Sequence, residues 1–417
     1  MKFNSRQAST LFGGIGRALS HRNFRRFWAA DAISTVGRWM YRMAVGWLTW
    51  ELTESTSWLG ILAFADTFPM VVLSVFAGAI ADRVGYVRVI RMCQIITTAI
   101  IALFAILTLA DSISIELVLA LAFLYGSLEA LSIPARLSVV HFLVPRHDLS
   151  AGIALGSATF NGARFIGPAI AGVLILWVDI GTVLAICAAA YLQFFVVLLL
   201  IPVDNTENDS RISLELLDDI VHSARYVIGH PGIRFLMLLL GATGLLIRPF
   251  MELLPGFSDQ VFDSGPDGMA MMMSAVGLGA TMSGLWLAQR GETRGLTYLV
   301  TISLIISALA LVLFTISDHI IFAVAFLTVV GFAMLMGGIG SQTLIQNTVD
   351  SDMRARVMSL FVLISWGLPA FGALLMGYFA EFAGLQVTIG VGGVVAALLW
   401  LWARRTGLGL AKELERA

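Results

Sequence analysis

Long apolar runs alternate with short polar stretches along almost the whole chain. A helix of about 20 residues crosses a bilayer, and twelve runs reach roughly that length, at 27–51, 57–81, 87–110, 115–138, 150–177, 181–201, 231–255, 268–288, 296–316, 319–343, 356–379 and 384–403. They are too long and too continuous for the strands of a membrane barrel. The pattern therefore predicts an all-α membrane protein with twelve transmembrane helices.

A polar segment divides the runs into six and six. This predicts an N-terminal half (1–201), a connecting segment (202–230) and a C-terminal half (231–417). Glycines of the fifth run recur in the eleventh, which indicates two pseudo-symmetric halves of the kind found in transporters, with the substrate path between them. Apolar residues at helical spacing from Ile212 to Val227 predict an amphipathic helix on the inner membrane surface. A plain linker is the alternative reading.

Basic residues give the chain a direction. Of the 26 Lys and Arg residues, 22 lie in or next to the amino terminus, alternate loops, the connecting segment or the carboxyl tail, whereas the opposite loops carry acidic residues. By the positive-inside rule both termini are expected in the cytoplasm, in a multi-pass protein of a bacterial inner membrane. Residues 1–26 lack the apolar core of a signal peptide, so we expect the amino terminus to be retained.

Composition excludes several other classes. The 417 residues are 58% hydrophobic and 13% charged, against about 25% charged in soluble domains. The two cysteines, Cys93 and Cys187, lie inside apolar runs, so no disulfide framework or thiolate metal site is expected. There is no phosphate-binding loop, metal motif or catalytic triad pattern. We therefore expect no enzyme activity, no cofactor, no metal and no nucleic-acid partner.

A short charged turn joins the second and third runs. Gly78 permits close approach of a neighbouring backbone, and Gly85 permits a tight turn. Asp82 places a carboxylate among the basic side chains of Arg83 and Arg88. The arginines alone fit an ordinary loop on the positive side of the membrane, but the spacing of all five residues indicates a more specific role.

Ionisable residues inside the runs are the main candidates for chemistry. A charge at the bilayer centre costs at least about 2.5–3.5 kcal/mol, so each must face the interior and find a partner or water. Structural ion pairs are one explanation; a pathway for substrate and protons is the other, and we favour it for the set: Asp31, Arg38, Arg42, Asp66, Glu129, Asn161, Arg164, Arg248 and Glu252.

The first run places several of these residues on one helical face. Asp31, Ser34, Thr35, Arg38 and Arg42 are spaced so that one face carries them all, and we expect it to line the cavity.

Four acids and four bases leave the charge of the substrate undecided. Carboxylates in an apolar cavity take up protons readily, so Asp31, Asp66 and Glu129 are the proton candidates.

The fifth run contains a second distinctive stretch. Pro168 inside a span favours a kink. Gly162, Gly167 and Gly172 would permit close packing and sliding against another helix. Packing alone is the simpler explanation, because membrane helices are rich in both residue types.

Together these motifs resemble the major facilitator superfamily over essentially the whole chain. The turn at 78–88 matches the signature between helices 2 and 3 of that family, except at Tyr86, where a basic residue is common. The resemblance implies a cytoplasmic gate, in which Asp82 engages nearby arginines and the start of helix 11 in one conformation. By position, Arg136 and the turn 352–356 are the candidate partners.

More local segments resemble the branch of bacterial siderophore (enterobactin-type) and drug exporters. These segments are 132–136, 144–146 and 163–169. The stretch 162–172 is similar to the helix 5 signature of proton-coupled exporters, with looser spacing. The helix 4 arginine signature of many antiporters is absent, and Glu129 lies in that region.

The sequence thus predicts a monomeric secondary transporter that exports a small organic molecule in exchange for protons, by alternating access of the two halves. A proton-coupled importer on the same fold and a non-transporting membrane receptor are the alternatives.

Overall fold

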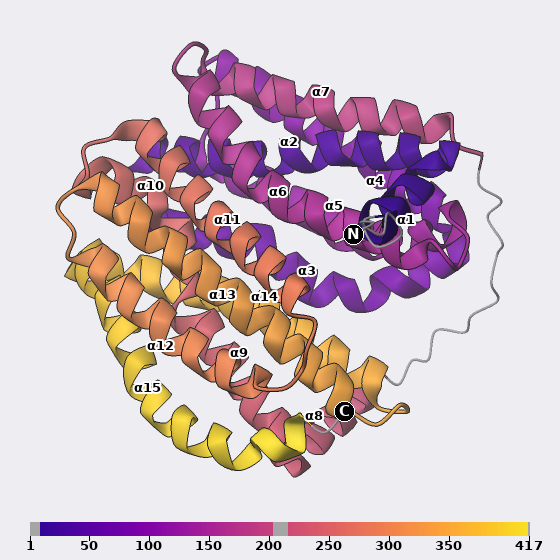
Figure 1. The fold of residues 1–417 in the computed structure, drawn as a ribbon. Helices are drawn as coiled ribbons and strands as arrows, with labels where there is room; N and C mark the ends of the chain where they lie inside the picture. Colours follow the sequence, from indigo (N-terminus) through magenta and orange to yellow (C-terminus); the bar gives the residue numbers. More distant parts are fainter. Residues whose placement is uncertain (1–8, 203–215, 416–417) are drawn as a thin grey trace, which may run out of the picture.

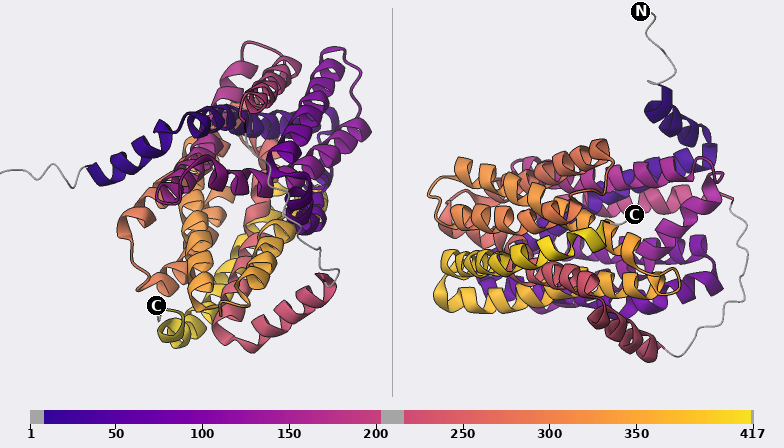
Figure 2. Two further views of the ribbon diagram at one scale, coloured as in Figure 1. Left: turned by 90° about the vertical axis from the view of Figure 1, so that its right-hand side faces the viewer. Right: turned by 60° about the horizontal axis from the view of Figure 1, so that its bottom comes forward.

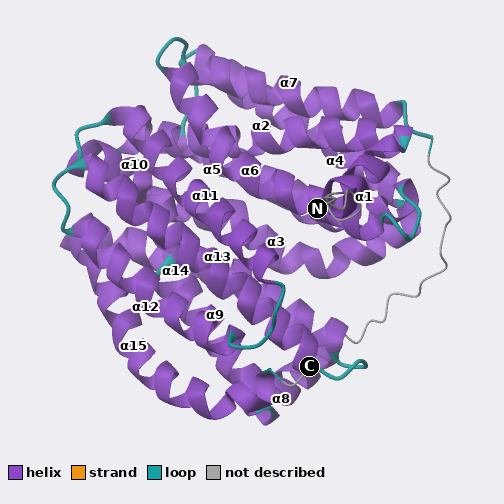
Figure 3. Cartoon of the chain, viewed as in Figure 1, coloured by secondary structure: helices purple, strands orange, loops and turns teal. Residues whose placement is uncertain are grey.

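Residues 9–202 and 216–415 are described by a computed structural model, and every regular element in that part of the chain is a helix (Figure 3). The first half begins with a short helix and continues with six long ones joined by short connections. Their bounds are α1 (Ser9–Ser20), α2 (Arg22–Thr53), α3 (Thr56–Val84), α4 (Tyr86–Leu109), α5 (Ile115–Leu143), α6 (Leu149–Ile175) and α7 (Ile180–Leu199).

The second half has the same number of spans, but its first one is broken. The elements are α8 (Leu216–Gly229), α9 (Pro231–Leu246), the 3₁₀ segment η1 (Arg248–Leu253), α10 (Leu254–Gly256), the π-helical segment η2 (Phe257–Val261), α11 (Gly265–Arg290), α12 (Leu296–Thr315), α13 (Ile320–Thr348), α14 (Arg354–Ala383) and α15 (Leu385–Leu414). Pro249 and Pro255 lie within the irregular part. Because proline lacks a backbone N–H, it interrupts the regular helical bonding there.

Eleven segments within the described ranges are long and apolar enough to cross a membrane. The twelfth span is α2, whose 32 residues would extend about 48 Å. Its composition is less apolar because it carries Asp31, Arg38 and Arg42. The helix packs along α6 and α7. The predicted fold class, an all-α membrane protein with twelve spans, is confirmed.

The spans form two groups in space. Figure 1 shows α2 to α7 on one side of the molecule and α9 to α15 on the other. Within the first group α3 packs on α5 and α4 on α7; within the second, α13 packs on both α11 and α12. The groups meet where α3 contacts α14 and where α6 contacts α11. The substrate path between the two halves stays a prediction.

The two ends of the bundle differ in charge. We call one the basic end, because its turns carry Arg83, Arg88, Arg146, Arg290, Arg294 and Arg354. We call the other the acidic end, because its connections carry Glu54, Asp111, Asp179, Asp263 and Asp318. Figure 2 shows α1 projecting at the basic end.

A buried carboxylate anchors α1 to that end. Asp148 accepts hydrogen bonds from Arg17 Nε and His21 Nε2, both at 3.1 Å. His147 Nε2 lies 3.3 Å away. The hydrogen bond from His21, together with that from Arg17, holds the pKa of Asp148 below its usual value. The junction of α1 and α2 is thereby tied to the start of α6.

The predicted amphipathic helix corresponds to α8, although Ile212 lies outside the described residues. Tyr226 Oη donates a hydrogen bond to Asp350 Oδ2 at 2.9 Å, and α8 also packs on α9 and α14. The helix is therefore attached to the second group of spans. Its position on a membrane surface stays a prediction.

The two groups are in contact at the acidic end and apart at the basic end. Along one face of α3, a Cβ on Gly60 would lie 2.5 Å from the Ala373 carbonyl oxygen of α14, whereas a Cβ on Gly78 would meet nothing within 4 Å. Between these two positions, a Cβ on Gly367 of α14 would lie 3.2 Å from Val71 Cγ2 of α3. These α3 positions share a face because 18 residues make five turns. Helices α3 and α14 therefore diverge toward the basic end.

Candidate functional site

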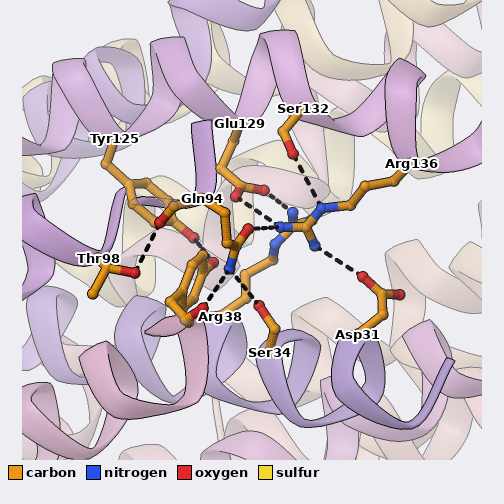
Figure 4. Close-up of polar contacts among 10 residues, drawn as sticks. Asp31, Ser34, Arg38, Gln94, Thr98, Tyr125, Glu129, Ser132 and Arg136 are labelled. Carbon is orange, nitrogen blue, oxygen red and sulfur yellow. Dashed lines mark hydrogen bonds and ion pairs between the residues drawn. The ribbon is translucent and has the colours of Figure 1, made fainter. Parts of the chain in front are cut away.

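Arg136 of α5 is the centre of a buried polar cluster (Figure 4). Its Nη1 donates to Asp31 Oδ1 at 3.2 Å and its Nη2 to Gln94 Oε1 at 2.8 Å. Its Nε donates to Ser132 Oγ at 3.1 Å, and Glu129 Oε1 lies 3.7 Å from Nη2. The guanidinium thus joins α2, α4 and α5 within the first group of spans.

Arg38 completes this cluster by pairing with Glu129. Gln94 in turn donates from Nε2 to Ser34 Oγ and to the Tyr191 carbonyl oxygen, both at 3.2 Å. We call Asp31, Arg38, Gln94, Glu129 and Arg136 the inner cluster. Its two carboxylates are matched by two arginines, so these charges stabilise the packing of one half. Arg136 therefore belongs to the buried bases, a fifth member that the sequence reading did not count.

A second ion-pair group crosses from one half to the other. Arg42 of α2 pairs with Glu252 of η1 and lies 3.5 Å from Asp66 Oδ2 of α3. The other carboxylate oxygen of Asp66, Oδ1, is buried without a hydrogen-bond partner. Because Arg42 and Asp66 belong to one group of spans and Glu252 to the other, separation of the halves at this level would break the Arg42–Glu252 pair.

Two more arginines contact no carboxylate among the described residues. Arg164 Nη2 lies 3.0 Å from Met251 Sδ, and its Cζ lies 5.5 Å from the ring centroid of Trp39. Arg248 Nη1 donates to the Ser365 carbonyl oxygen at 2.6 Å, and its Cζ lies 5.8 Å from the ring centroid of Trp366.

These arginines face a cavity between the halves. Its lining comes from both sides of the interface and includes Trp39, Arg42, Thr67, Phe160, Arg164, Arg248, Met251, Glu252, Trp366 and Pro369. The cavity has a volume of about 140 Å³. An adjoining cavity, lined by Arg38, Asp66 and Glu129, extends it toward the inner cluster. The arrangement combines aromatic surface with a few convergent charges, as ligand sites do.

The break in the seventh span positions one wall of this cavity. The 3₁₀ segment η1 carries Arg248, Met251 and Glu252. 3₁₀ and π turns inside a helix are frequent at functional sites. Discontinuous helices form the binding sites of many transporters. The paired prolines 249 and 255 are the sequence signal that marks this break.

The glycine and proline stretch of α6 divides into packing residues and one open position. A Cβ on Gly167 would lie 2.5 Å from Trp39 Cβ, and one on Gly172 would lie 2.2 Å from Ala270 Cβ of α11. Pro168 is buried, whereas Gly162 has open space beside it. Gly172 thus allows α6 and α11 of opposite halves to touch near the acidic end.

The charged turn at 78–88 is not joined through Asp82 to its predicted partners in the described part of the chain. Asp82 accepts a hydrogen bond from Tyr86 Oη, and Gly85 adopts a positive φ of 92°. Arg83 and Arg88 are exposed. Within the described ranges Asp82 makes no ion pair. The candidate partner Arg136 belongs instead to the inner cluster. The gate implied by the family resemblance is therefore not engaged in this conformation.

One predicted pathway residue, Asn161, and one residue of the predicted cavity-lining face, Ser34, are bonded within the protein. Asn161 Nδ2 donates to the Ser157 carbonyl oxygen of its own helix at 2.9 Å. Ser34 is completely buried against Gln94, so it does not line the cavity. Gln94, Trp39 and Trp366 were not predicted as site residues, because their residue types are ordinary in membrane helices.

The described residues contain no group of three or more His, Cys, Asp or Glu side chains placed to hold a metal ion. Four acids and five arginines are instead held in ion pairs, hydrogen bonds and aromatic contacts. The chemistry available is charge pairing and proton uptake.

A model of the transmembrane secretion effector family matches residues 17–413. The chain is similar to the staphyloferrin A transporter of Staphylococcus aureus, with 26% identity over 88% of this chain and 92% of that protein. It is also similar to the multidrug efflux pump Tap of Mycolicibacterium fortuitum, with 26% identity over 83% of this chain and 86% of that protein. Among solved structures, the nucleoside transporter NupG matches with a TM-score of 0.74 and 14% identity, covering 92% of this chain and 99% of NupG.

Proposed function

Because this chain belongs to the transmembrane secretion effector family of the major facilitator superfamily, we propose that it exports a small organic molecule in exchange for protons. It is a multi-pass membrane transporter and not an enzyme. We further propose that it works as a monomer in the bacterial inner membrane, with the basic end and both termini in the cytoplasm. The positive-inside rule supports this orientation.

In that orientation the molecule is open to the cytoplasm and closed to the outside. The divergence of α3 and α14 toward Gly78 supports the opening. Closure is supported by Thr56 Oγ1, which donates to the Gly377 carbonyl oxygen at 2.9 Å, and by Trp50 Nε1, which donates to Asp259 Oδ2 at 3.0 Å. An exporter collects its substrate in such a conformation.

The observation that carries the proposal is the pairing of Arg42 with carboxylates of both halves. Outward opening would separate Arg42 from Glu252, and a carboxylate left without its cation in an apolar cavity takes up a proton. Return to the inward-open conformation would bring Arg42 back and release that proton. We assign the proton to Glu252, since Asp66, Asp31 and Glu129 each keep an arginine partner within one half.

Inside-out vesicles test direction and energy source together. Vesicles containing the protein should accumulate substrates from a compound panel when their lumen is acidic, and an uncoupler should abolish the accumulation. Accumulation that survives the uncoupler but stops on ATP depletion would contradict proton coupling. Accumulation only by right-side-out vesicles would indicate import. Vesicles with Arg42→Gln serve as the matched inactive control.

A further inference from the structure

The charges around the cavity are not evenly matched. Arg38, Arg42 and Arg136 share four carboxylates, those of Asp31, Asp66, Glu129 and Glu252. Arg164 and Arg248 therefore remain as two positive charges without a carboxylate partner in the described part of the chain, and both face the same cavity. The excess of positive charge lies at Arg164 and Arg248, because all four carboxylates are paired with the other three arginines.

The contacts of these two arginines are incomplete. Arg164 touches a thioether and the face of Trp39, and its Nε is buried without a hydrogen-bond partner. Arg248 uses one nitrogen on a backbone carbonyl and lies over Trp366. A guanidinium stays charged at physiological pH and offers five donors, so most donors of each group are unused by protein acceptors. Both side chains are half-buried. Charges withdrawn from water are normally paired, and an anion would supply the missing partner.

We propose that this cavity binds an organic carboxylate, with Arg164 and Arg248 as the binding residues for its anionic group. The inference rests on the proposed function and names its substrate class. A planar carboxylate fits the fork of a guanidinium in a bidentate way. Trp39, Phe160, Trp366 and Pro369 line the same cavity, so the rest of the ligand is flat and apolar.

The two arginines come from opposite halves of the molecule. Arg164 lies on α6 and Arg248 on the 3₁₀ segment of the broken seventh span. One carboxylate between them would replace the repulsion of two like charges with two attractive contacts. Binding of the anion would therefore favour approach of the two helices and couple occupancy to the relative position of the halves.

Binding of matched probes to the full-length protein in detergent tests this assignment. The probes are 2-naphthoate and 2-naphthamide, which differ in charge and share the aromatic body. Calorimetric titration should show the acid binding at least about tenfold more tightly than the amide, because charge-assisted hydrogen bonds exceed neutral ones by this order. Arg164→Gln and Arg248→Gln should each remove that preference, and Arg→Lys at the same positions should retain part of it.

Arg404 provides the matched control. Its guanidinium also lies on a tryptophan, 5.5 Å from the ring centroid of Trp400, but it is exposed on α15 and does not line the cavity. Arg404→Gln should keep the full preference for the acid. Unliganded melting temperatures of all variants show whether a loss of binding reflects misfolding. If the Gln variants do not fold, the comparison of acid and amide on the unmodified protein still shows whether the cavity prefers a carboxylate.

The assignment would be overturned by equal binding of acid and amide, or by an unchanged preference for the acid in the Gln variants. Tighter binding of a third probe, 2-naphthyl phosphate, than of the acid and the amide would also overturn it. The outcome is separable from the proposed function. Vesicles that export neutral compounds while the probes show no preference for the acid would reject only the carboxylate site. Absence of proton-driven export, with the acid preference intact, would reject only the transport proposal.

Discussion

The buried charges differ in what each side chain contacts. Arg136 has four polar partners within one half, whereas Arg42 pairs with one carboxylate from each half. Arg164 contacts a thioether and, among the described residues, no carboxylate. We therefore propose that structural ion pairs and pathway residues coexist among residues of the same type. We interpret the inner cluster as chiefly structural and the groups around Arg42, Arg164 and Arg248 as the functional part.

Replacement of Arg136 tests the structural assignment. Arg136→Gln leaves Asp31 without its cation and Glu129 with one cation less, and removal of one partner from a buried pair costs about 3–5 kcal/mol. We expect a clearly lower melting temperature in detergent. Adding Asp31→Asn to this variant should recover part of the loss, because the uncompensated charge is removed. Strictly additive losses in the double variant would show that the two side chains are not coupled.

Spacing along α2 predicted the cavity face only in part. Residues Asp31, Arg38 and Arg42 all reach charged partners near the cavity. Ser34, three residues after Asp31, is rotated by about 60° toward α4 and is bonded by Gln94. A span in a bundle has neighbours on several sides, so periodicity identifies its polar face but not which neighbour that face meets.

Element boundaries followed the apolar runs to within about five residues, except in the seventh span and at the end of α15, which continues to Leu414 beyond the predicted end at 403. The predicted apolar run continues to residue 255 without interruption, whereas the backbone changes from α-helix to 3₁₀ and π geometry between residues 248 and 261. Hydrophobicity does not record this change, because a broken helix surrounded by protein is as apolar as an intact one. Pro249 and Pro255 were the available signal, and they place the break beside Arg248 and Glu252.

Contacts between elements also close the acidic end. Glu381 of α14 accepts hydrogen bonds from Ser55 Oγ at 2.9 Å, Thr56 Oγ1 at 3.1 Å and the Ser57 backbone N–H at 3.2 Å. The carboxylate thus caps the start of α3 from the opposite half. Such caps are worth about 0.5–2 kcal/mol, and this one exists only while the two halves touch.

We predict that Glu381→Gln loosens this closure. Loss of about 1–2 kcal/mol would raise the population open at the acidic end by roughly 5–30-fold. Paired spin labels at the exposed positions Leu52 and Phe382 should report a longer distance population. Glu415→Gln is the control, since Glu415 caps α12 through Gly295 and Thr297 within one half. An equal change in both variants would argue against a role for Glu381 in closure.

At the scale of the whole molecule, the sequence predicts which end of the bundle faces the cytoplasm, but not which end of the cavity is open. The unequal distribution of basic residues between the two ends and the recurrence of glycines in the two halves depend on residue types alone, so both can be recognised along the chain. Which end of the cavity is open depends on a small difference between two packings of the same helices. The turn around Asp82 illustrates this, because in the present conformation its carboxylate is bonded by Tyr86 of the next helix and not by the other half.

Asp82 is therefore predicted to act when the basic end closes. If it then joins the turn 352–356, Asp82→Asn removes the charge and should deplete the closed population by one or more decades, with near-normal yield and severely reduced transport. Tyr86→Phe removes the contact that Asp82 makes in the open conformation and should shift the balance toward closure. Spin labels at the exposed positions Leu137 and Gln346 would measure the distance across the basic end. An unchanged distance distribution in a stable, inactive Asp82→Asn protein would exclude the gate, and lower thermal stability with lower membrane yield would assign Asp82 to the fold of the turn.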